Sequence, residues 1–296
     1  MKGSAIRQLA GSDHCPLIAA GHFEHRVEIW NVATFEKVTE LDTPLDFGGN
    51  RLAISADGKT LLAGSYYVPG LAAFSIPLGS LLWRRKDLRQ LQRLDLKSHD
   101  STVAAGFEKG PLHILNIENG ETVEQIRGAQ RRHSSPFKNI HLFEKRTLEL
   151  HSPNYRKPLK IKREQFGVLS ICFSADAVVI SEATGPVRCF ALDDGSLRWR
   201  YQPSAGWHVL HLGYNSSTRV FLGIERHYDS RDRIYPLRFF DERTGEVVHS
   251  APTDQASDHC FALQGTRLVS TDGWILNTSD AKLIGSLAFP LKDYRV

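Results

Sequence analysis

The motifs that mark several common enzyme classes are absent from this chain of 296 residues. It contains no phosphate-binding loop, no G-x-S-x-G nucleophile elbow and no H-E-x-x-H zinc motif. Its four cysteines, Cys15, Cys172, Cys189 and Cys260, are dispersed, without a CxxC pair or zinc-ligand spacing. Scattered cysteines are typical of reduced thiols in a cytosolic protein, not of a disulfide framework. We therefore expect no metal and no cofactor.

Long hydrophobic runs are also missing. Arg7 interrupts the N-terminal segment before an apolar stretch develops, so no secretory signal is visible and we expect a cytoplasmic protein. Residues 60–83 carry no charge, but two prolines and three glycines interrupt them. Because a helix tolerates such breakers poorly, we read this segment as buried strands with turns and expect no association with a membrane.

The overall composition is that of an ordinary globular protein. Hydrophobic residues make up 41% of the chain and charged residues 24%, and the formal net charge is +4. This net charge does not by itself argue for a nucleic-acid partner. No segment shows convincing helical periodicity, so we expect little helix.

The strongest signal in the sequence is an internal repeat. Residues 74–84 and 190–200 share the pattern F-x-[I/L]-x-x-G-S-L-x-W-R. Upstream of each, Ser55-Ala-Asp matches Ser174-Ala-Asp, and the glycines at 79, 120, 195 and 245 recur in corresponding turns. Each unit thus has a Ser-Ala-Asp turn, two apolar strands, a glycine turn and a further strand.

This spacing predicts an all-β fold, a single seven-bladed β-propeller over residues 1–296 with four-stranded antiparallel blades. Seven units of about 42 residues fit the expected length of a propeller blade. The third unit shows its strands at 93–97, 102–106, 112–115 and 122–126. The fourth, at about 139–164, is degenerate: 147–151 and 159–163 alternate, but no fourth strand is obvious. Six or eight blades therefore stay open.

Several strings resemble known repeat families. Val27-Glu-Ile-Trp-Asn31 resembles the strand ending that names WD40 repeats, with Asn in place of Asp. Residues 192–199 and 241–245 are also similar to quinoprotein-like propeller repeats. The full Gly-His and Trp-Asp signature is missing, so the resemblance implies a divergent WD40-like or quinoprotein-like propeller. Trp83 and Trp199 are interpreted as residues that pack one blade on the next.

A basic stretch lies between Arg127 and Arg163. It contains eleven lysines and arginines but only Glu144 and Glu149 as acids. One interpretation is a surface for an acidic protein partner or, as an alternative, for nucleic acid. The other is a solvated blade edge that positive charge protects against strand addition. Aromatic residues are not interleaved with the charges, which makes nucleic acid an unlikely partner.

Aromatic and arginine side chains recur in loops that we expect to share one face of the propeller: those from the second strand of a blade to the third, and from blade to blade. Such residues often anchor protein interfaces. The candidate partner-binding residues are Tyr66, Tyr67, Arg131, Arg132, Tyr155, Arg156, Trp207, Tyr228, Arg231 and Arg233.

The function predicted from these observations is protein binding without catalysis. The chain is expected to be a monomer when free and to act as an adaptor or a dedicated inhibitor, for example an immunity protein. A propeller hydrolase or lyase with a site in the axial channel is the alternative. His22-x-x-His25 has ligand-like spacing, but a strand or turn lacks the geometry of two helical ligands, so we assign no metal site.

Overall fold

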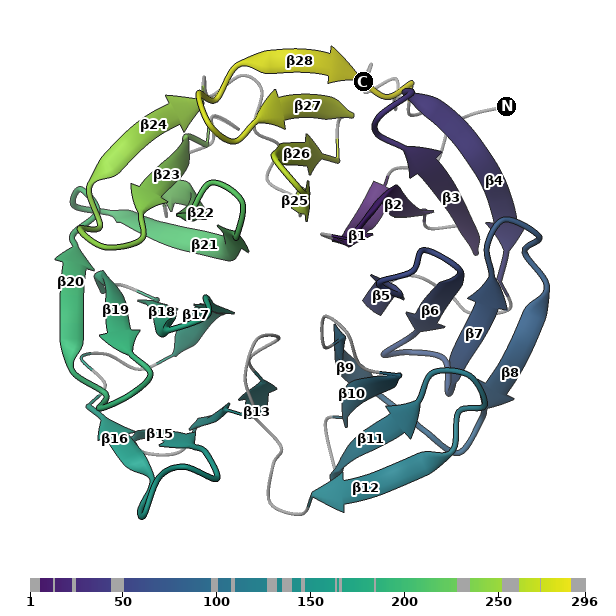
Figure 1. Cartoon of the computed structure of the whole chain (residues 1–296), viewed down its shortest axis with the longest axis horizontal. Coiled ribbons are helices and arrows are strands. Elements are labelled where there is room, and N and C mark those ends of the chain that lie inside the picture. Colours follow the sequence, from purple (N-terminus) through teal and green to yellow (C-terminus); the bar gives the residue numbers. More distant parts are fainter. Residues whose placement is uncertain are drawn as a thin grey trace. The chain divides into compact units, whose positions relative to one another are not determined.

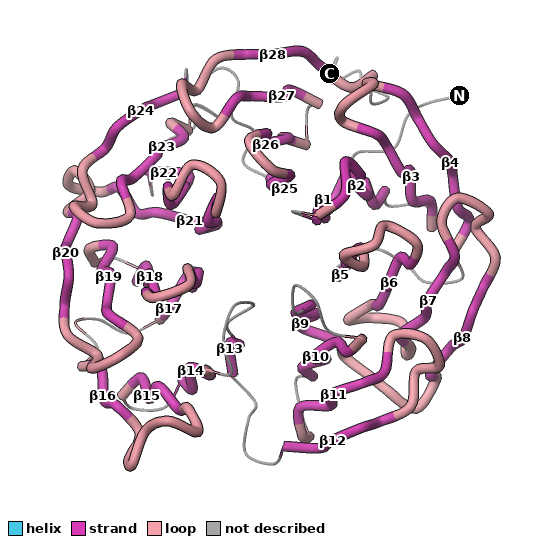
Figure 2. The backbone as a smooth tube through the Cα atoms, in the orientation of Figure 1, coloured by secondary structure: helices cyan, strands magenta, loops and turns pink. Residues whose placement is uncertain are grey.

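A computed structural model describes most of the chain. The described residues are 6–12, 14–22, 25–43, 51–96, 101–107, 110–126, 132–134, 140–144, 147–162, 164, 167–183, 185–227, 235–251, 261–271 and 273–288. They form strands and turns but no helix (Figure 2). Accordingly, no helix within these ranges is long and apolar enough to span a bilayer.

The strands form seven four-stranded antiparallel sheets, and the chain divides into two compact units. Unit 1 comprises residues 1–130, 259–275 and 284–296, and unit 2 comprises residues 131–258 and 276–283. In each sheet the strands follow one another in chain order, as Figure 1 shows.

Unit 1 contains three complete sheets. The first comprises β1 (Ile6–Ser12), β2 (Cys15–His22), β3 (Arg26–Asn31) and β4 (Glu36–Asp42). The second comprises β5 (Arg51–Ile54), β6 (Thr60–Gly64), β7 (Leu71–Ser75) and β8 (Leu81–Arg85). The third comprises β9 (Leu91–Leu96), β10 (Thr102–Phe107), β11 (Leu112–Asn116) and β12 (Thr122–Ile126).

Unit 2 contains three further sheets. They comprise β13 (Arg132–Ser134), β14 (His141–Glu144), β15 (Leu148–His151) and β16 (Leu159–Ile161); then β17 (Val168–Phe173), β18 (Ala177–Glu182), β19 (Val187–Ala191) and β20 (Leu197–Tyr201); then β21 (Trp207–Asn215), β22 (Val220–His227), β23 (Leu237–Asp241) and β24 (Val247–Ala251). The last sheet of the chain comprises β25 (Phe261–Gln264), β26 (Arg267–Ser270), β27 (Trp274–Asn277) and β28 (Leu283–Ser286).

The Ser-Ala-Asp strings form the turns between the first and second strands of their sheets. In the β5–β6 turn the Ser55 hydroxyl donates to Asp57 Oδ1 at 2.6 Å and accepts the Thr60 amide at 2.9 Å. In the β17–β18 turn Ser174 donates to Asp176 Oδ1 at 3.3 Å and accepts the Ala177 amide at 3.1 Å. Both strings therefore place a serine that bonds the aspartate side chain and the first amide of the next strand, although the first turn spans residues 55–59 and the second only 174–176.

The repeated tryptophans fasten successive sheets together. Trp83, on the last strand of its sheet, donates from Nε1 to the Ile117 carbonyl of the next sheet at 2.7 Å. Trp199 donates to the Glu242 carbonyl at 2.9 Å, so both copies of the string make the same inter-sheet bond. The interpretation of these two residues as packing residues is confirmed.

The core lies between consecutive sheets. The inner strands are buried on both faces, and every residue of β18 is buried. Ala177, Val179, Val187 and Cys189 of one sheet pack against Val209, Phe221 and Phe240 of the next. A single sheet could not bury both of its apolar faces, so stacking is what stabilises each one.

Most of the strand predictions are confirmed. The third unit has its four strands where the sequence places them, and residues 60–83 form strands and turns. The degenerate fourth unit is a four-stranded sheet as well, but its first strand, β13, precedes the range of 139–164 assigned to it. Arg132-His133-Ser134 offers no apolar alternation from which the strand could be recognised.

Candidate partner-binding surface

In unit 1, two adjacent tyrosines occupy the connection between β6 and β7. Tyr67 is 66% exposed, and its ring meets that of Tyr66 edge-on with the centroids 5.2 Å apart. The buried Ser65 hydroxyl accepts the backbone amides of Tyr67 at 3.2 Å and of Val68 at 3.1 Å. The Leu91 amide donates to the Ser65 carbonyl at 3.2 Å, which ties the connection to β9. Tyr67 is thus an exposed aromatic side chain on a braced loop.

In unit 2, the corresponding end of a sheet carries Trp207 and His227. These residues are paired across β21 and β22, and their rings lie 5.4 Å apart. His227 also lies against Gly206, whose φ of +81° places it in the left-handed region. Trp207 therefore stands beside the end of β22, where the connection to β23 begins.

An ionic contact between Glu225 and Arg238 joins β22 and β23 near this end of the sheet. Glu225, on β22, is 4% exposed and accepts the Tyr201 hydroxyl from the preceding sheet. Arg238, on β23, donates from Nε to the same carboxylate at 2.8 Å. Burial, followed by the hydrogen bond and charge of Glu225, raises the pKa of Tyr201. The tyrosine therefore stays protonated and can keep donating to the carboxylate at neutral pH.

Two of the predicted interface residues lie elsewhere. Tyr155 and Arg156 are in the connection between β15 and β16, the third and fourth strands of their sheet. That connection is at the opposite end of the sheet from the β14–β15 connection. Moreover, the Tyr155 hydroxyl donates to the Leu192 carbonyl, which follows β19. The expectation that these residues share a face with the second-to-third-strand loops was wrong, because the unrecognised β13 shifts the strand count by one.

The remaining candidates are not placed in detail. Arg131, Tyr228, Arg231 and Arg233 lie outside the described residues. Arg132 is part of β13, and only its backbone is described. Their assignment to a partner surface stays a prediction from the sequence.

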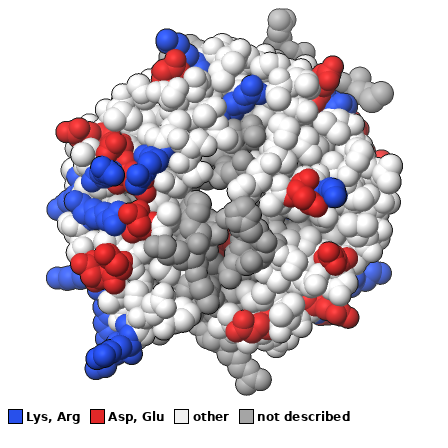
Figure 3. Space-filling model, in the orientation of Figure 1, with Lys and Arg blue, Asp and Glu red and all other residues white. Residues whose placement is uncertain are grey.

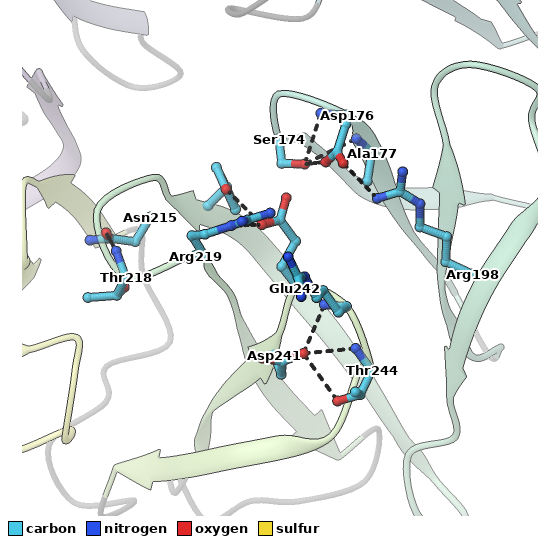
Figure 4. A network of polar contacts seen from close by, with 12 residues as sticks. Ser174, Asp176, Ala177, Arg198, Asn215, Thr218, Arg219, Asp241, Glu242 and Thr244 are labelled. Carbon is cyan, nitrogen blue, oxygen red and sulfur yellow. Dashed lines mark hydrogen bonds and ion pairs between the residues drawn. The ribbon is translucent and has the colours of Figure 1, made fainter.

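Charged side chains gather over β17–β24, on the face seen in Figure 3. Glu242, 2% exposed, accepts Arg219 Nε at 2.8 Å (Figure 4). It also accepts the Tyr214 hydroxyl at 3.1 Å. Nearby, Arg198 Nη1 lies 3.2 Å from Asp176 Oδ2. The Arg198 charge and the hydrogen bonds of Asp176 outweigh its desolvation and lower the pKa of that carboxyl. Arginine and carboxylate are therefore matched in this network.

The two histidines of the His22-x-x-His25 motif lie in different environments. His22 is fully buried, with Nε2 3.4 Å from Glu28 Oε2, whereas His25 is exposed and has a φ of +61°. Glu28 also accepts Trp30 Nε1 at 3.1 Å. Despite the cost of burial, the bonds from His22 and Trp30 lower the pKa of Glu28. No group of three or more metal-ligating side chains occurs among the residues described.

Comparison with known proteins identifies the fold. No protein-family model and no curated protein matches the sequence. Among solved structures, the C-terminal WD40 domain of Sif2 superposes with a TM-score of 0.69 and 13% identity, covering 90% of this chain and 93% of that one. The computationally designed protein Ika8 superposes with a TM-score of 0.65 and 16% identity, covering 95% of this chain and 86% of that one. The chain has a WD40-like β-propeller fold with four-stranded antiparallel blades.

Proposed function

We propose that this chain is a protein-binding module and that the β6–β7 connection of unit 1 is one of its contact sites. The observation that carries the proposal is Tyr67, an exposed aromatic side chain on a loop that Ser65 holds from within. Because the loop is already ordered, a partner would not have to supply the free energy for ordering it. Tyrosine is also among the side chains that most often dominate interface energies.

Trp207 in unit 2 supports the same function independently. It combines a large aromatic surface with a position beside the β22–β23 connection, and the Tyr201–Glu225–Arg238 contact fixes the strands behind it. A dedicated inhibitor, such as an immunity protein that neutralises a toxin, is one specific form of this function. An adaptor is another. A propeller enzyme remains the alternative from the sequence, and no arrangement of the described residues favours it.

The test compares how tightly the purified unchanged chain and its Tyr67→Ala variant bind a captured partner. We expect a stoichiometric partner of the unchanged chain to be bound at least about thirtyfold more weakly by the variant, the effect of an interface hot spot of about 2 kcal/mol. Thermal unfolding of the variant should be unchanged, because the Tyr67 side chain is mostly exposed.

Leu78 provides the matched control. It is 83% exposed and lies in the β7–β8 turn, at the opposite end of the same sheet. Leu78→Ala should bind the partner as the unchanged chain does. Equal binding by the two variants and the unchanged chain would remove the β6–β7 connection from the proposal, and the absence of any stoichiometric partner would count against the binding function itself.

A further inference from the structure

The β15–β16 hairpin and the residue that follows it carry four cations for which no acidic partner occurs among the residues that the structure describes. Arg156, Lys157, Lys160 and Lys162 are all exposed. None of the four forms an ion pair with any residue that the structure describes. Glu149, which is opposite Lys160 in the β15–β16 register, instead contacts His151 Nε2 at 3.2 Å. Figure 3 shows basic side chains over the lower left of unit 2, where Figure 1 places β16.

This surplus differs from the β17–β20 sheet, where Arg188, Arg198 and Arg200 all lie beside acids, and from part of the β21–β24 sheet. The pairs are Arg188–Glu182 at 2.9 Å, Arg200–Glu164 at 3.0 Å, Arg198–Asp176 at 3.2 Å, Arg219–Glu242 at 2.8 Å and Arg238–Glu225 at 2.8 Å. Unpaired cations so close together repel one another, and an acidic partner would relieve that repulsion. The charge of the hairpin is therefore available to a ligand, whereas the five arginines named above already lie beside carboxylates.

The backbone of β16 offers a second, independent observation. β16 is the outer strand of its sheet, and it pairs with β15 in an unbroken register from Leu148↔Ile161 to Leu150↔Leu159. In five other sheets the outer strand meets its neighbour with a register shift, which affects β4, β8, β12, β20 and β24. Bulges of this kind protect an exposed edge against further pairing. Among the outer strands whose pairing is described, β16 is the one that pairs with its neighbour without a register shift.

The regular edge of β16 and its positive charge together favour the addition of an acidic strand. Lys160 in β16 and Lys162 directly after it are two residues apart and both exposed, whereas Ile161 between them is 2% exposed. A second copy of this edge would bring lysines against lysines, so the charge excludes self-association. An extended segment with a carboxylate at every second position would place its charges beside these ammonium groups.

We propose that β16 binds an extended acidic segment of a partner protein by strand addition, with Lys160 and Lys162 contacting its carboxylates. The proposal rests on the proposed function only in taking the partner to be a protein, and it uses a surface other than Tyr67. Nucleic acid fits this surface less well, because the one aromatic side chain of the connection, Tyr155, is partly buried and its hydroxyl is bonded to Leu192.

The test measures binding of a fluorescein-labelled peptide that alternates threonine and glutamate over about ten residues, a usual strand length. The full-length chain should bind it, more weakly at about 200 mM than at about 50 mM salt. A peptide of equal charge with proline in place of two central threonines should bind at least about tenfold more weakly, because proline cannot extend a ladder. The double variant Lys160→Glu, Lys162→Glu should lose at least about tenfold in affinity.

Three controls separate this site from other effects. Lys86→Glu, an exposed position in the β8–β9 connection, should bind the peptide like the unchanged chain. The double variant Lys160→Gln, Lys162→Gln keeps the strand and removes the charge, so it should also lose affinity even if the Glu variant folds poorly. Tyr67→Ala should retain peptide binding, so failure of the proposed contact at Tyr67 and failure of the β16 site give different results.

Three results would overturn the proposal. Equal affinity for the proline-containing peptide would show that no strand is added. Tighter binding of a single-stranded oligonucleotide, lost in both double variants, would make the edge a nucleic-acid site. Absence of peptide binding at the lower salt concentration would show that the surplus charge recruits no acidic segment.

Discussion

At the scale of single residues, the turn glycines of the repeat meet two separate requirements. Gly120 and Gly245 both have a φ of +71°. A Cβ on Gly120 would lie 2.6 Å from Trp83 Cε3, and one on Gly245 would overlap the Trp199 ring. The tryptophan of one sheet can therefore cover the turn of the next only because that turn has no side chain. The repeated glycine and tryptophan of the sequence therefore contact each other between neighbouring sheets.

This contact predicts that Gly245→Ala destabilises the chain beyond the cost of its backbone conformation. The left-handed conformation costs about 1 kcal/mol for alanine, and displacement of the Trp199 ring should add about 1–3 kcal/mol. Gly265→Ala is the control, because Gly265 has a φ of +53° but no atom within 4 Å of its added Cβ. Urea unfolding of both variants measures the difference. Equal losses would show that the ring yields without cost.

At the scale of elements, the Ser-Ala-Asp turn between β5 and β6 depends on a charged acceptor. The hydrogen bond from Ser55 is the main cause that lowers the pKa of Asp57, and the Lys59 amide contributes as well. A carboxyl whose pKa is lower in the folded chain stabilises the fold above its unfolded pKa of about 3.9. That stabilisation is lost as the pH falls through the lower, folded-state pKa.

We therefore expect Asp57→Asn to lower the urea midpoint at neutral pH, and to lower it progressively less as the pH falls below the unfolded pKa of about 3.9 and Asp57 takes up its proton. The stability curves of the two proteins should converge as the pH falls through the acidic range. Chemical denaturation at a series of pH values provides the measurement. Curves that stay parallel throughout this range would mean that the charge of Asp57 does not stabilise the turn.

The elements that the sequence predicted correctly are those in which local chemistry determines the structure. Ser-Ala-Asp turns, glycine turns and apolar strands recur in the same order, so their positions could be read from the repeat. β13 could not, because Arg132-His133-Ser134 is a strand only by pairing with β14. Missing that one strand also assigned Tyr155 and Arg156 to the wrong end of their sheet.

The candidate surfaces were predictable only in part. Tyr67 and Trp207 could be proposed as aromatic anchors, of which Tyr67 is exposed and Trp207 half-buried, and the excess of lysine and arginine was visible. Which cations are neutralised was not, because the partners are distant in sequence, as with Arg219 and Glu242. The regular edge of β16 is likewise a property of its pairing with β15, which composition does not specify.

At the scale of the whole molecule, the first and last sheets of the chain share a core within unit 1. Ile18, Ala20 and Trp30 from the N-terminal sheet pack with Val269 and Ile275 from the C-terminal one. β25 lies beside β1, and Arg267 donates to the Val32 carbonyl from the other end of the chain. The first and last sheets therefore contribute to one hydrophobic cluster, so each covers apolar side chains of the other.

This shared core predicts that Ile275→Ala costs about 2–5 kcal/mol, the usual cost of truncating a fully buried aliphatic side chain. Ile275 is 0% exposed, whereas Ile284 in the same sheet is 45% exposed. Ile284→Ala should therefore change stability by no more than about 0.5 kcal/mol. Urea unfolding of the two variants is the measurement. Equal, small losses would mean that the last sheet frays independently of the rest, whereas the expected contrast would show that the core shared by the two sheets contributes to the stability of the fold.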